Sequence, residues 1–185
     1  YSVFRIGAAT NNISWKSVQA LSAHEGVDWV VPLSLGDSHR GFAVLATTPA
    51  YFRHFHYGDH QALVLREGRP FDALFDAVLG ADVAERLGYR VGQRITLAHG
   101  TGELVTEHTD KPFTVVGILA RTGTPVDRTV HIGLQAMEAI HLDWRGGAPM
   151  PGLRVPVAKL GEMDLTPKNV TAALVGLKNR AAVFG

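Results

Sequence analysis

The sequence predicts an α+β fold: a mixed-sheet lobe with short helices, plus a smaller β-rich lobe or elaborated loop. Short apolar segments alternate with amphipathic ones through most of the 185 residues. Hydrophobic residues make up 46% of the chain, which is enough for a packed core. Residues 143–168 interrupt the alternation with four prolines and four glycines. We therefore treat 1–185 as one domain, with two lobes and a Pro/Gly-rich insertion or loop at 143–168.

The first quarter of the chain predicts a strand, a helix and a hairpin. Trp15, Val18 and Leu21 repeat at helical spacing, and Ser14 before them suits an N-cap. Pro32 favours an edge or a bulge in the strand that contains it. The expected elements are a strand over 2–8, a helix over 14–24 that ends at Gly26, a strand over 27–35, a turn over 36–41 and a returning strand over 42–47.

The middle of the chain carries the clearest pattern. Thr48-Pro49 opens a short helix with Tyr51, Phe52 and Phe55, and the region that follows, through residues 66–70, is assigned no element. Residues 113–120 are apolar at both odd and even positions, which predicts a central strand covered on both faces. The other expected elements are a buried strand over 77–80, a helix over 82–87 closed by Gly88, strands over 94–98 and 129–132, a helix over 134–140, and a last strand over 169–178.

Charge and composition exclude several classes of function. Eighteen Lys and Arg residues against 17 Asp and Glu residues give a net charge of +1, so nucleic acid is not an expected partner. The chain has no cysteine, which excludes disulfides and thiolate metal sites. No apolar run approaches the ~18 residues that span a bilayer. The start at Tyr1 and the stop at Gly185 lead us to expect a piece of a longer protein.

No catalytic motif is present. The sequence lacks a phosphate-binding G-x-x-x-x-G-K-[ST] loop and a G-x-S-x-G elbow, and His24-Glu25 has no second histidine at zincin spacing. The carboxylates are scattered without an acid/base pair. We therefore predict no enzyme activity, no catalytic residue and no cofactor.

Histidines offer one alternative function. His54, His56 and His60 lie close together with Asp59, and imidazole and carboxylate suit zinc. The competing interpretation is a polar surface segment packed by its aromatic residues, and we favour it because the spacing matches no metal motif. Of the other histidines, His131 is expected in the core, whereas the following are expected to be solvated: His24, His39, His99, His108 and His141.

Tryptophans divide between core and loop. Trp15 and Trp29 lie on the faces of predicted elements and are expected to pack in the core. Trp144 lies beside Arg145 in the Pro/Gly-rich segment. The sequence is compatible with two roles for its side chain: contact with a partner protein, or packing against its own domain.

The order of motifs over residues 79–140 resembles a known family. An apolar strand at Val78-Leu79-Gly80 precedes a small-residue helix that ends in Leu87-Gly88. The segments that carry the rest of the resemblance are 50–52 (AYF), 68–71 (GRPF), 91–95 (VGQRI), 113–118 (FTVVGI) and 131–134 (HIGL). Together they resemble the extracytoplasmic core domain of MacB-like (FtsX-like) ABC transporter permeases. Residues 53–60 and 143–168 depart from the family pattern.

The resemblance implies a porter-like lobe and a non-catalytic role. The expected function is to couple ATP-driven motion of membrane helices to export, lipoprotein extraction or signalling. The implied partners are the protein's own membrane helices, a second permease chain, cytoplasmic ATPase subunits and a periplasmic protein. The implied location is the periplasmic or extracellular face of the bacterial inner membrane. Such a loop between membrane helices predicts that residues 2–8 and 169–178 form paired or neighbouring strands. The sequence does not identify the transported substrate.

Overall fold

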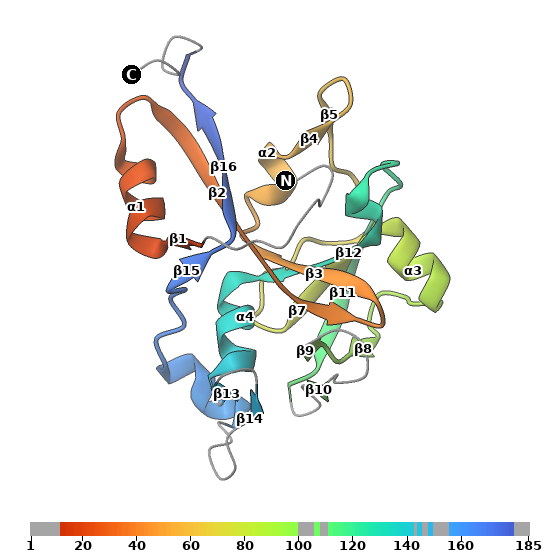
Figure 1. The fold of residues 1–185 in the computed structure, drawn as a ribbon. Helices are drawn as coiled ribbons and strands as arrows, with labels where there is room; N and C mark the ends of the chain where they lie inside the picture. The colour runs from red at the N-terminus through yellow and green to blue at the C-terminus, as the bar shows by residue number, and fades with distance from the viewer. Residues whose placement is uncertain are drawn as a thin grey trace.

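A mixed sheet organises the fold (Figure 1). The computed structural model describes residues 12–99, 106–107, 111–142, 144–145, 148–149 and 156–179. Within these residues the main sheet has the strand order β10-β9-β2-β3-β12-β7-β11-β6, with β16 added to β2 and β8 added to β11. Parallel and antiparallel pairs occur side by side, since β12 is parallel to β3 and antiparallel to β7. The predicted α+β class with a mixed sheet is confirmed.

The elements have the following bounds. The helices are α1 (Trp15–Ala23), α2 (Tyr51–His54), α3 (Ala81–Leu87), α4 (Leu134–His141) and the 3-10 helices η1 (Pro125–Arg128) and η2 (Val157–Glu162). The strands of the first half are β1 (Ile13–Ser14), β2 (Val27–His39), β3 (Phe42–Thr47), β4 (His56–Tyr57), β5 (Gln61–Ala62), β6 (Leu65–Gly68), β7 (Asp76–Leu79) and β8 (Arg94–Ile95). Those of the second half are β9 (Ala98–His99), β10 (Thr106–Glu107), β11 (Phe113–Leu119), β12 (Thr129–Gly133), β13 (Trp144–Arg145), β14 (Ala148–Pro149), β15 (Asn169–Val170) and β16 (Ala172–Leu177).

The first helix begins as predicted and ends differently. Ser14 caps α1, because its side-chain oxygen accepts a hydrogen bond from the backbone N–H of Ser17. At the other end, the C-cap is His24 in an extended conformation, and Gly26 donates its N–H to the His24 ring. The expectation that Gly26 stops the helix was wrong, since the chain turns straight into β2 without a left-handed residue at this point.

The second strand is longer than predicted. The expected turn over 36–41 was wrong: β2 continues to His39 through a register shift between Leu35 and Ser38, and the hairpin turn consists of Arg40 and Gly41 alone. The bulge lets a polar Gly-Asp-Ser segment stay in the strand. Pro32 lies in the half of β2 that pairs with β16, opposite Ala173.

The motif region folds close to expectation. Strand β7 is buried throughout, and Gly88 closes α3 in the left-handed conformation with φ 67°. Residues 65–68 form strand β6. The strand expected over 94–98 is instead divided into β8 and β9, which pair with different neighbours, β11 and β2.

Strand β11 is buried on both faces, as its nearly continuous apolar sequence predicted. Val115 and Ile118 face one core cluster, and Val116 and Leu119 face a second one. The partners of β11 are β7 on one side and β6 and β8 on the other. Gly117 is placed opposite Gly68, where a Cβ atom on either residue would collide with the neighbouring backbone.

The C-terminal part is more structured than predicted. Within 143–168 the described residues include the β13–β14 pair and η2, whose Leu160 is buried against α4. The single strand expected over 169–178 is divided at Thr171 into β15, which pairs with β1, and β16, which pairs with β2. The strand expected over 2–8 lies outside the described residues, so its pairing stays a prediction, as does the division into two lobes.

Candidate functional site

The histidine segment was the one predicted candidate for a metal site. His54 ends α2, and its ring stacks on Trp29 with centroids 4.4 Å apart. His56 begins β4, and its Nδ1 lies 3.0 Å from the backbone oxygen of His54. His60 is exposed in the β4–β5 turn with φ 58°. Within the described part of the chain, no three His, Asp or Glu side chains are grouped so that they could hold one metal ion. The structure therefore does not bring the three imidazoles together.

Two other histidines lie in the core, one of them against expectation. His39 was expected to be solvated, but it is 4% exposed. Its Nδ1 lies 2.6 Å from the backbone oxygen of Thr96, so Nδ1 donates and Nε2 accepts from the Tyr89 hydroxyl at 3.0 Å. This hydrogen-bond pair ties the end of β2 to the segment between β8 and β9. His131 is fully buried, as expected, with Nδ1 3.2 Å from the Val78 oxygen.

His141 at the end of α4 was also expected to be solvated and is half-buried. Its Nε2 lies 3.3 Å from Asp37 Oδ1, and its Nδ1 donates to the Met137 oxygen at 2.8 Å. Burial lowers the pKa of His141, but the hydrogen bond and the charge of Asp37 outweigh it, so the pKa is raised above 6.5. The bulge of β2 places Asp37 inward and makes this contact with α4 possible.

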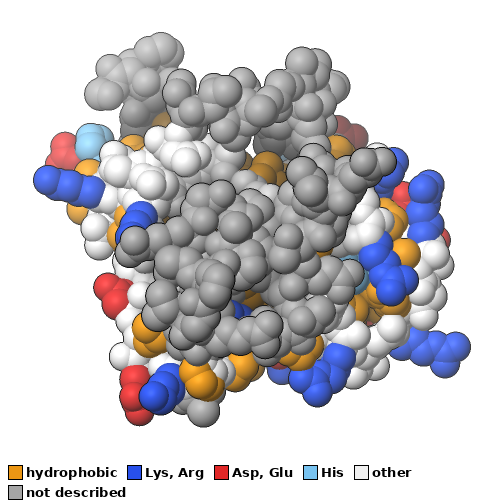
Figure 2. Space-filling view, turned by 60° about the horizontal axis from the view of Figure 1, so that its bottom comes forward, with side chains coloured by type: hydrophobic (Ala, Val, Ile, Leu, Met, Phe, Trp, Pro, Cys, Tyr) orange, Lys and Arg blue, Asp and Glu red, His pale blue; other side chains and the backbone are white. Residues whose placement is uncertain are grey.

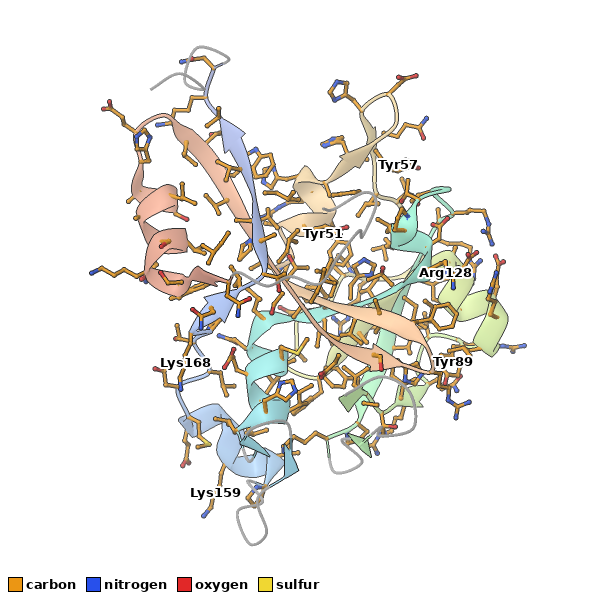
Figure 3. All side chains as sticks on the ribbon, in the orientation of Figure 1. Tyr51, Tyr57, Tyr89, Arg128, Lys159 and Lys168 are labelled. Atoms are coloured by element: carbon orange, nitrogen blue, oxygen red, sulfur yellow. The ribbon has the colours of Figure 1, made fainter. Side chains whose placement is uncertain are left out.

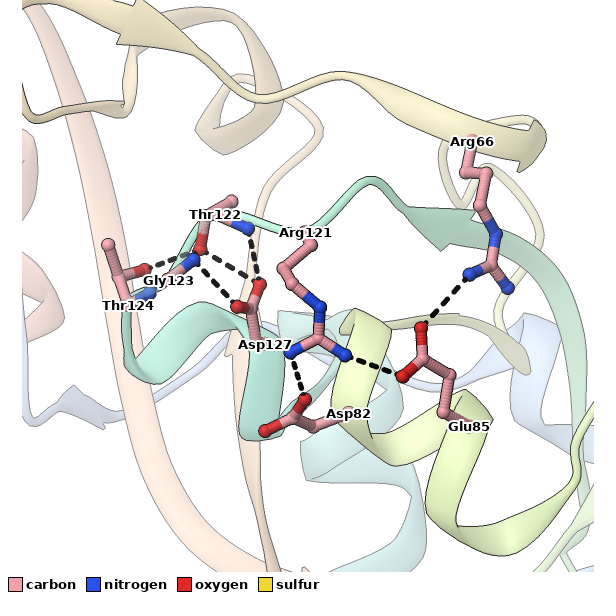
Figure 4. Close-up of polar contacts among 8 residues, drawn as sticks. All are labelled: Arg66, Asp82, Glu85, Arg121, Thr122, Gly123, Thr124 and Asp127. Atoms are coloured by element: carbon pink, nitrogen blue, oxygen red, sulfur yellow. Dashed lines mark hydrogen bonds and ion pairs between the residues drawn. The ribbon is translucent and has the colours of Figure 1, made fainter.

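The Thr-Gly-Thr-Pro loop at residues 122–125 is closed by Asp127 (Figure 4). The carboxylate of Asp127 accepts hydrogen bonds from the backbone N–H groups of Thr122 and Gly123 and from the Thr122 hydroxyl. Thr124 caps η1 by accepting from the Val126 N–H. The loop therefore uses its own carboxylate to satisfy its donors, which is a structural role.

An exposed charge network lies beside this loop (Figure 4). Arg121 pairs with Asp82 and Glu85 of α3, and Arg66 of β6 reaches Glu85 at 3.5 Å. The hydrogen bond that Arg121 donates to Asp82 and the charges of Glu85 and Asp82 raise the pKa of Arg121, which is charged in any case. Since all of these side chains except Asp82 are at least 41% exposed, the network contributes little to the stability of the fold.

Strand β2 changes its pairing partner part-way along its length. From Val27 to Leu33, β2 pairs with β16, and from Ser34 to His39 it pairs with β3. At the change, the Thr47 hydroxyl donates to the Pro32 oxygen at 2.8 Å. Thr171 donates its N–H to the Leu33 oxygen, and its hydroxyl accepts from the Leu35 N–H at 3.0 Å. We name these five residues the β2 junction.

A groove lies beside the β2 junction. Two adjoining cavities of about 420 and 430 Å³ share Trp15, Gln19 and Thr48. The first lies between α1 and β2, and the second extends to the first turn of α4. Val18 is the only residue of α1 that is buried, and Leu21 is 37% exposed. Helix α1 therefore covers β2 loosely.

Sequence patterns did not reveal the β2 junction. The residues that form it come from three separate segments, and two of its side chains are single threonines with no motif around them. Trp15 and Trp29 pack against the core clusters, as expected. Trp144 lies in β13, and the role of its side chain stays a prediction.

Comparison with solved structures shows two similar folds. The first is the extracellular domain of the noncanonic ABC-type transporter YknZ from Gram-positive bacteria, with a TM-score of 0.57 and 12% identity over 96% of this chain and 79% of that one. The second is the periplasmic region of MacB from Actinobacillus actinomycetemcomitans, with a TM-score of 0.52 and 12% identity over 94% of this chain and 70% of that one. Comparison with curated protein sequences gives no match.

The family is settled by the sequence itself. The model of the MacB-like periplasmic core domain matches residues 2–166, a stretch that includes every motif segment named above. The same stretch contains β2, β3 and the whole of the motif region from β7 to α4. The chain belongs to the MacB-like periplasmic core domain family of ABC transporters.

Proposed function

We propose that this domain couples ATP-driven motion of membrane helices to work outside the membrane, as part of an ABC transporter permease. That work is substrate export, lipoprotein extraction or signalling. The observation that carries the proposal is the course of β2, which pairs first with the late strand β16 and then with the main sheet. A displacement applied to β16 reaches the main sheet through one continuous strand.

The structure of the connection supports force transmission. The register of β16 on β2 extends from Ala172–Leu33 to Leu177–Val27, so the two strands resist sliding along most of that length. We call β16 and the first half of β2 the ribbon, and the β1–β15 pair ties an early segment to a late one at its base. At the β2 junction, the Thr47 and Thr171 hydroxyls hold the ribbon to the main sheet. Within the described residues, no helix has the length and apolar character needed to cross a bilayer.

The family gives this proposal its partners and location. The domain would be carried by its own membrane helices on the periplasmic or extracellular face of the bacterial inner membrane. A second permease chain and the cytoplasmic ATPase subunits would complete the transporter, and a periplasmic protein is a further expected partner. The role needs no catalysis in this domain, so purified protein should show no ATPase, peptidase or esterase activity.

The test uses the full-length permease with its ATPase subunits in lipid nanodiscs. The 185 residues contain no cysteine, so single labels can be introduced without removing native thiols from the domain. One label replaces Leu177 on the ribbon, and another, in a separate sample, replaces Val64 beside the main sheet, where the side chain is 61% exposed. Distances between the labels of the two permease copies are measured by pulsed electron paramagnetic resonance. Both distances should change when a non-hydrolysable ATP analogue is added.

The β2 junction supplies the decisive comparison. Replacing both hydroxyls, Thr47→Val with Thr171→Val, removes the side-chain hydrogen bonds to β2 and changes the volume little. The Leu177 distance should still respond to nucleotide in this variant, whereas the response at Val64 should shrink. A Val64 distance that never responds to nucleotide in the unaltered protein would overturn the proposal.

The metal- or ligand-binding alternative has less support. It required His54, His56 and His60 to converge, and the structure stacks His54 on Trp29 and leaves His60 exposed in a turn. We therefore retain it only as the competing outcome of the zinc experiment described in the Discussion.

A further inference from the structure

A polar cavity lies at the tip of the β2–β3 hairpin, away from the β2 junction. Its volume is about 430 Å³. The hairpin, Tyr89 and the β8–β9 segment surround it, and Figure 3 shows Tyr89 beside the hairpin turn. The described lining residues are Ser38, His39, Arg40, Gly41, Tyr89, Gln93, Arg94, Ile95, Thr96, Ala98 and Pro112. Two of them are arginines, and none is Asp or Glu.

The two arginines are not used by the fold. Arg40 and Arg94 are exposed, and neither forms an ion pair or a side-chain hydrogen bond with any residue that the structure describes. The arginines of the network in Figure 4, by contrast, are paired with Asp82 and Glu85. Figure 2 shows Lys and Arg side chains predominating on the right-hand side of the molecule, where α3 and β8 lie in Figure 1. The cavity therefore has an unbalanced positive charge among its described residues.

Arg40 is held in a conformation that disfavours arginine. Arg40 and Gly41 form a two-residue hairpin loop with φ 47° and 82°, the signs that a type I′ turn requires at both positions. Asn, Asp or Gly is preferred at the first position, because a larger side chain is strained at positive φ. Arginine at this position adds a cation to the lining of the cavity at the expense of stability, which favours a role in binding.

The cavity wall is rigid. The His39 ring accepts a hydrogen bond from the Tyr89 hydroxyl and donates one to the Thr96 oxygen, so both rings have fixed positions. Arg94 is next to Ile95, which is packed in the core, and the strand alternation therefore turns Arg94 outward. A preformed wall whose lining includes two arginines lowers the entropy cost of binding a small anion.

We propose that this cavity binds a phosphate group, with Arg40 and Arg94 as its ligands. Guanidinium groups donate two parallel hydrogen bonds to a phosphate, and two arginines balance the charge of a dianion. A free phosphate compound and a phospholipid headgroup present the same chemistry. The inference does not depend on the coupling function, because it concerns a different face of the domain.

The experiment titrates the purified domain with inorganic phosphate at low salt and follows backbone amide resonances. Shifts are expected at residues 38–41 and 94–96, and they should weaken as sodium chloride screens the charges. Arg40→Asn and Arg94→Gln should each reduce phosphate affinity about tenfold or more, since each removes charged hydrogen bonds. Arg53→Asn is the matched control: Arg53 is an exposed arginine of α2 and should leave affinity unchanged.

Arg40→Asn also separates binding from folding. Asn suits the left-handed conformation, so this variant should melt at a higher temperature than the unaltered protein while it binds phosphate less tightly. Sedimentation with phosphatidylglycerol or phosphatidylcholine vesicles distinguishes the sources. Binding to phosphatidylglycerol that Arg40→Asn abolishes identifies a lipid headgroup, and phosphate binding without vesicle binding identifies a free compound. The absence of any saturable shift, or affinity that is unchanged in both arginine variants, overturns the proposal.

Discussion

Gly176 of β16 lies flat against the indole ring of Trp29 on β2, closer than any side chain could approach. A Cβ atom on residue 176 would overlap the ring atoms Cε2 and Nε1. The same ring stacks on His54 of α2. Trp29 therefore joins the ribbon, made of β16 and the first half of β2, to the short helix that follows β3. A glycine is needed at position 176 because the ring occupies the space of a side chain.

Replacing Gly176 with alanine should destabilise the domain by about 1–3 kcal/mol, since either the ring or β16 must move. The measurement is urea unfolding followed by tryptophan fluorescence, which also reports the environment of Trp29. Gly36→Ala is the control, because a Cβ atom there has nothing within 4 Å. Equal unfolding midpoints for the two variants would contradict the packing described here.

The fold was predictable where one local pattern decides it. The continuous apolar run of β11, the helix of small residues before Gly88, and the Ser14 cap all appear in the sequence as they do in the structure. Elements that depend on distant partners were predicted less well. Residues 36–38 have turn composition, yet they continue β2 because pairing with β3 and β9 and the contact of Asp37 with His141 favour the strand. Thr171 divides the last strand because β1 and β2 are separate partners.

Asp127→Ala should destabilise the domain by roughly 2–4 kcal/mol. The variant leaves the N–H groups of Thr122 and Gly123 and the Thr122 hydroxyl without their acceptor in a partly buried loop. Thermal melting of the purified domain measures the effect. Asp59→Ala, at an exposed turn, is the matched control and should change the melting temperature little. A comparable loss in both variants would mean that Asp127 does not hold the loop.

The candidate sites show the same limit of sequence reasoning. The cluster of three histidines was visible as a pattern, but its geometry depends on Trp29, which is 25 residues earlier in the chain than His54. The β2 junction, conversely, has no pattern, because the contacts of Thr47 and Thr171 follow from tertiary pairing. Family motifs identified the class of protein without indicating which contacts carry its function.

Stability should fall as pH rises from about 6.5 toward 8. The pKa of His141 is raised above 6.5: burial lowers it, and the hydrogen bond and charge of Asp37 raise it by more. A raised pKa in the folded state means that folding favours the protonated ring. The contribution is therefore complete below the unfolded pKa near 6.5 and is lost as pH passes the folded value.

His141→Gln tests this prediction, because it keeps a polar side chain and cannot take up a proton. Melting temperature is measured at half-unit intervals between pH 6 and 8 for both proteins. The slope should be shallower in the variant. Glu138 also has a raised pKa, caused by burial and opposed by the charges of His141 and Lys168, so its effect on stability begins near pH 4.5 and has the same sign as pH rises. Identical slopes would show that the contact with Asp37 has no effect on stability in this range.

Zinc should leave the melting temperature unchanged. A site made by His54, His56 and His60 would bind only the folded state and stabilise it by ~2.7 kcal/mol at a hundredfold excess over Kd. That stabilisation would weaken as pH falls through ~6.5, where protons compete for the ring nitrogens. The geometry opposes such a site. Moving His54 to meet His60 would break its stack on Trp29, and His56 already contacts the backbone oxygen of His54.

The decisive measurement is a set of thermal melts with zinc and with a chelator, on the unaltered domain and on His56→Ala. We expect the same melting temperature with zinc and with chelator in the unaltered domain, because binding would have to supply the free energy that separating His54 from Trp29 costs. His56→Ala changes one exposed side chain and should melt close to the unaltered domain. A zinc-dependent rise that disappears in His56→Ala would instead show that residues 54–60 rearrange around the metal, and the metal-binding alternative would then replace the surface interpretation of this segment.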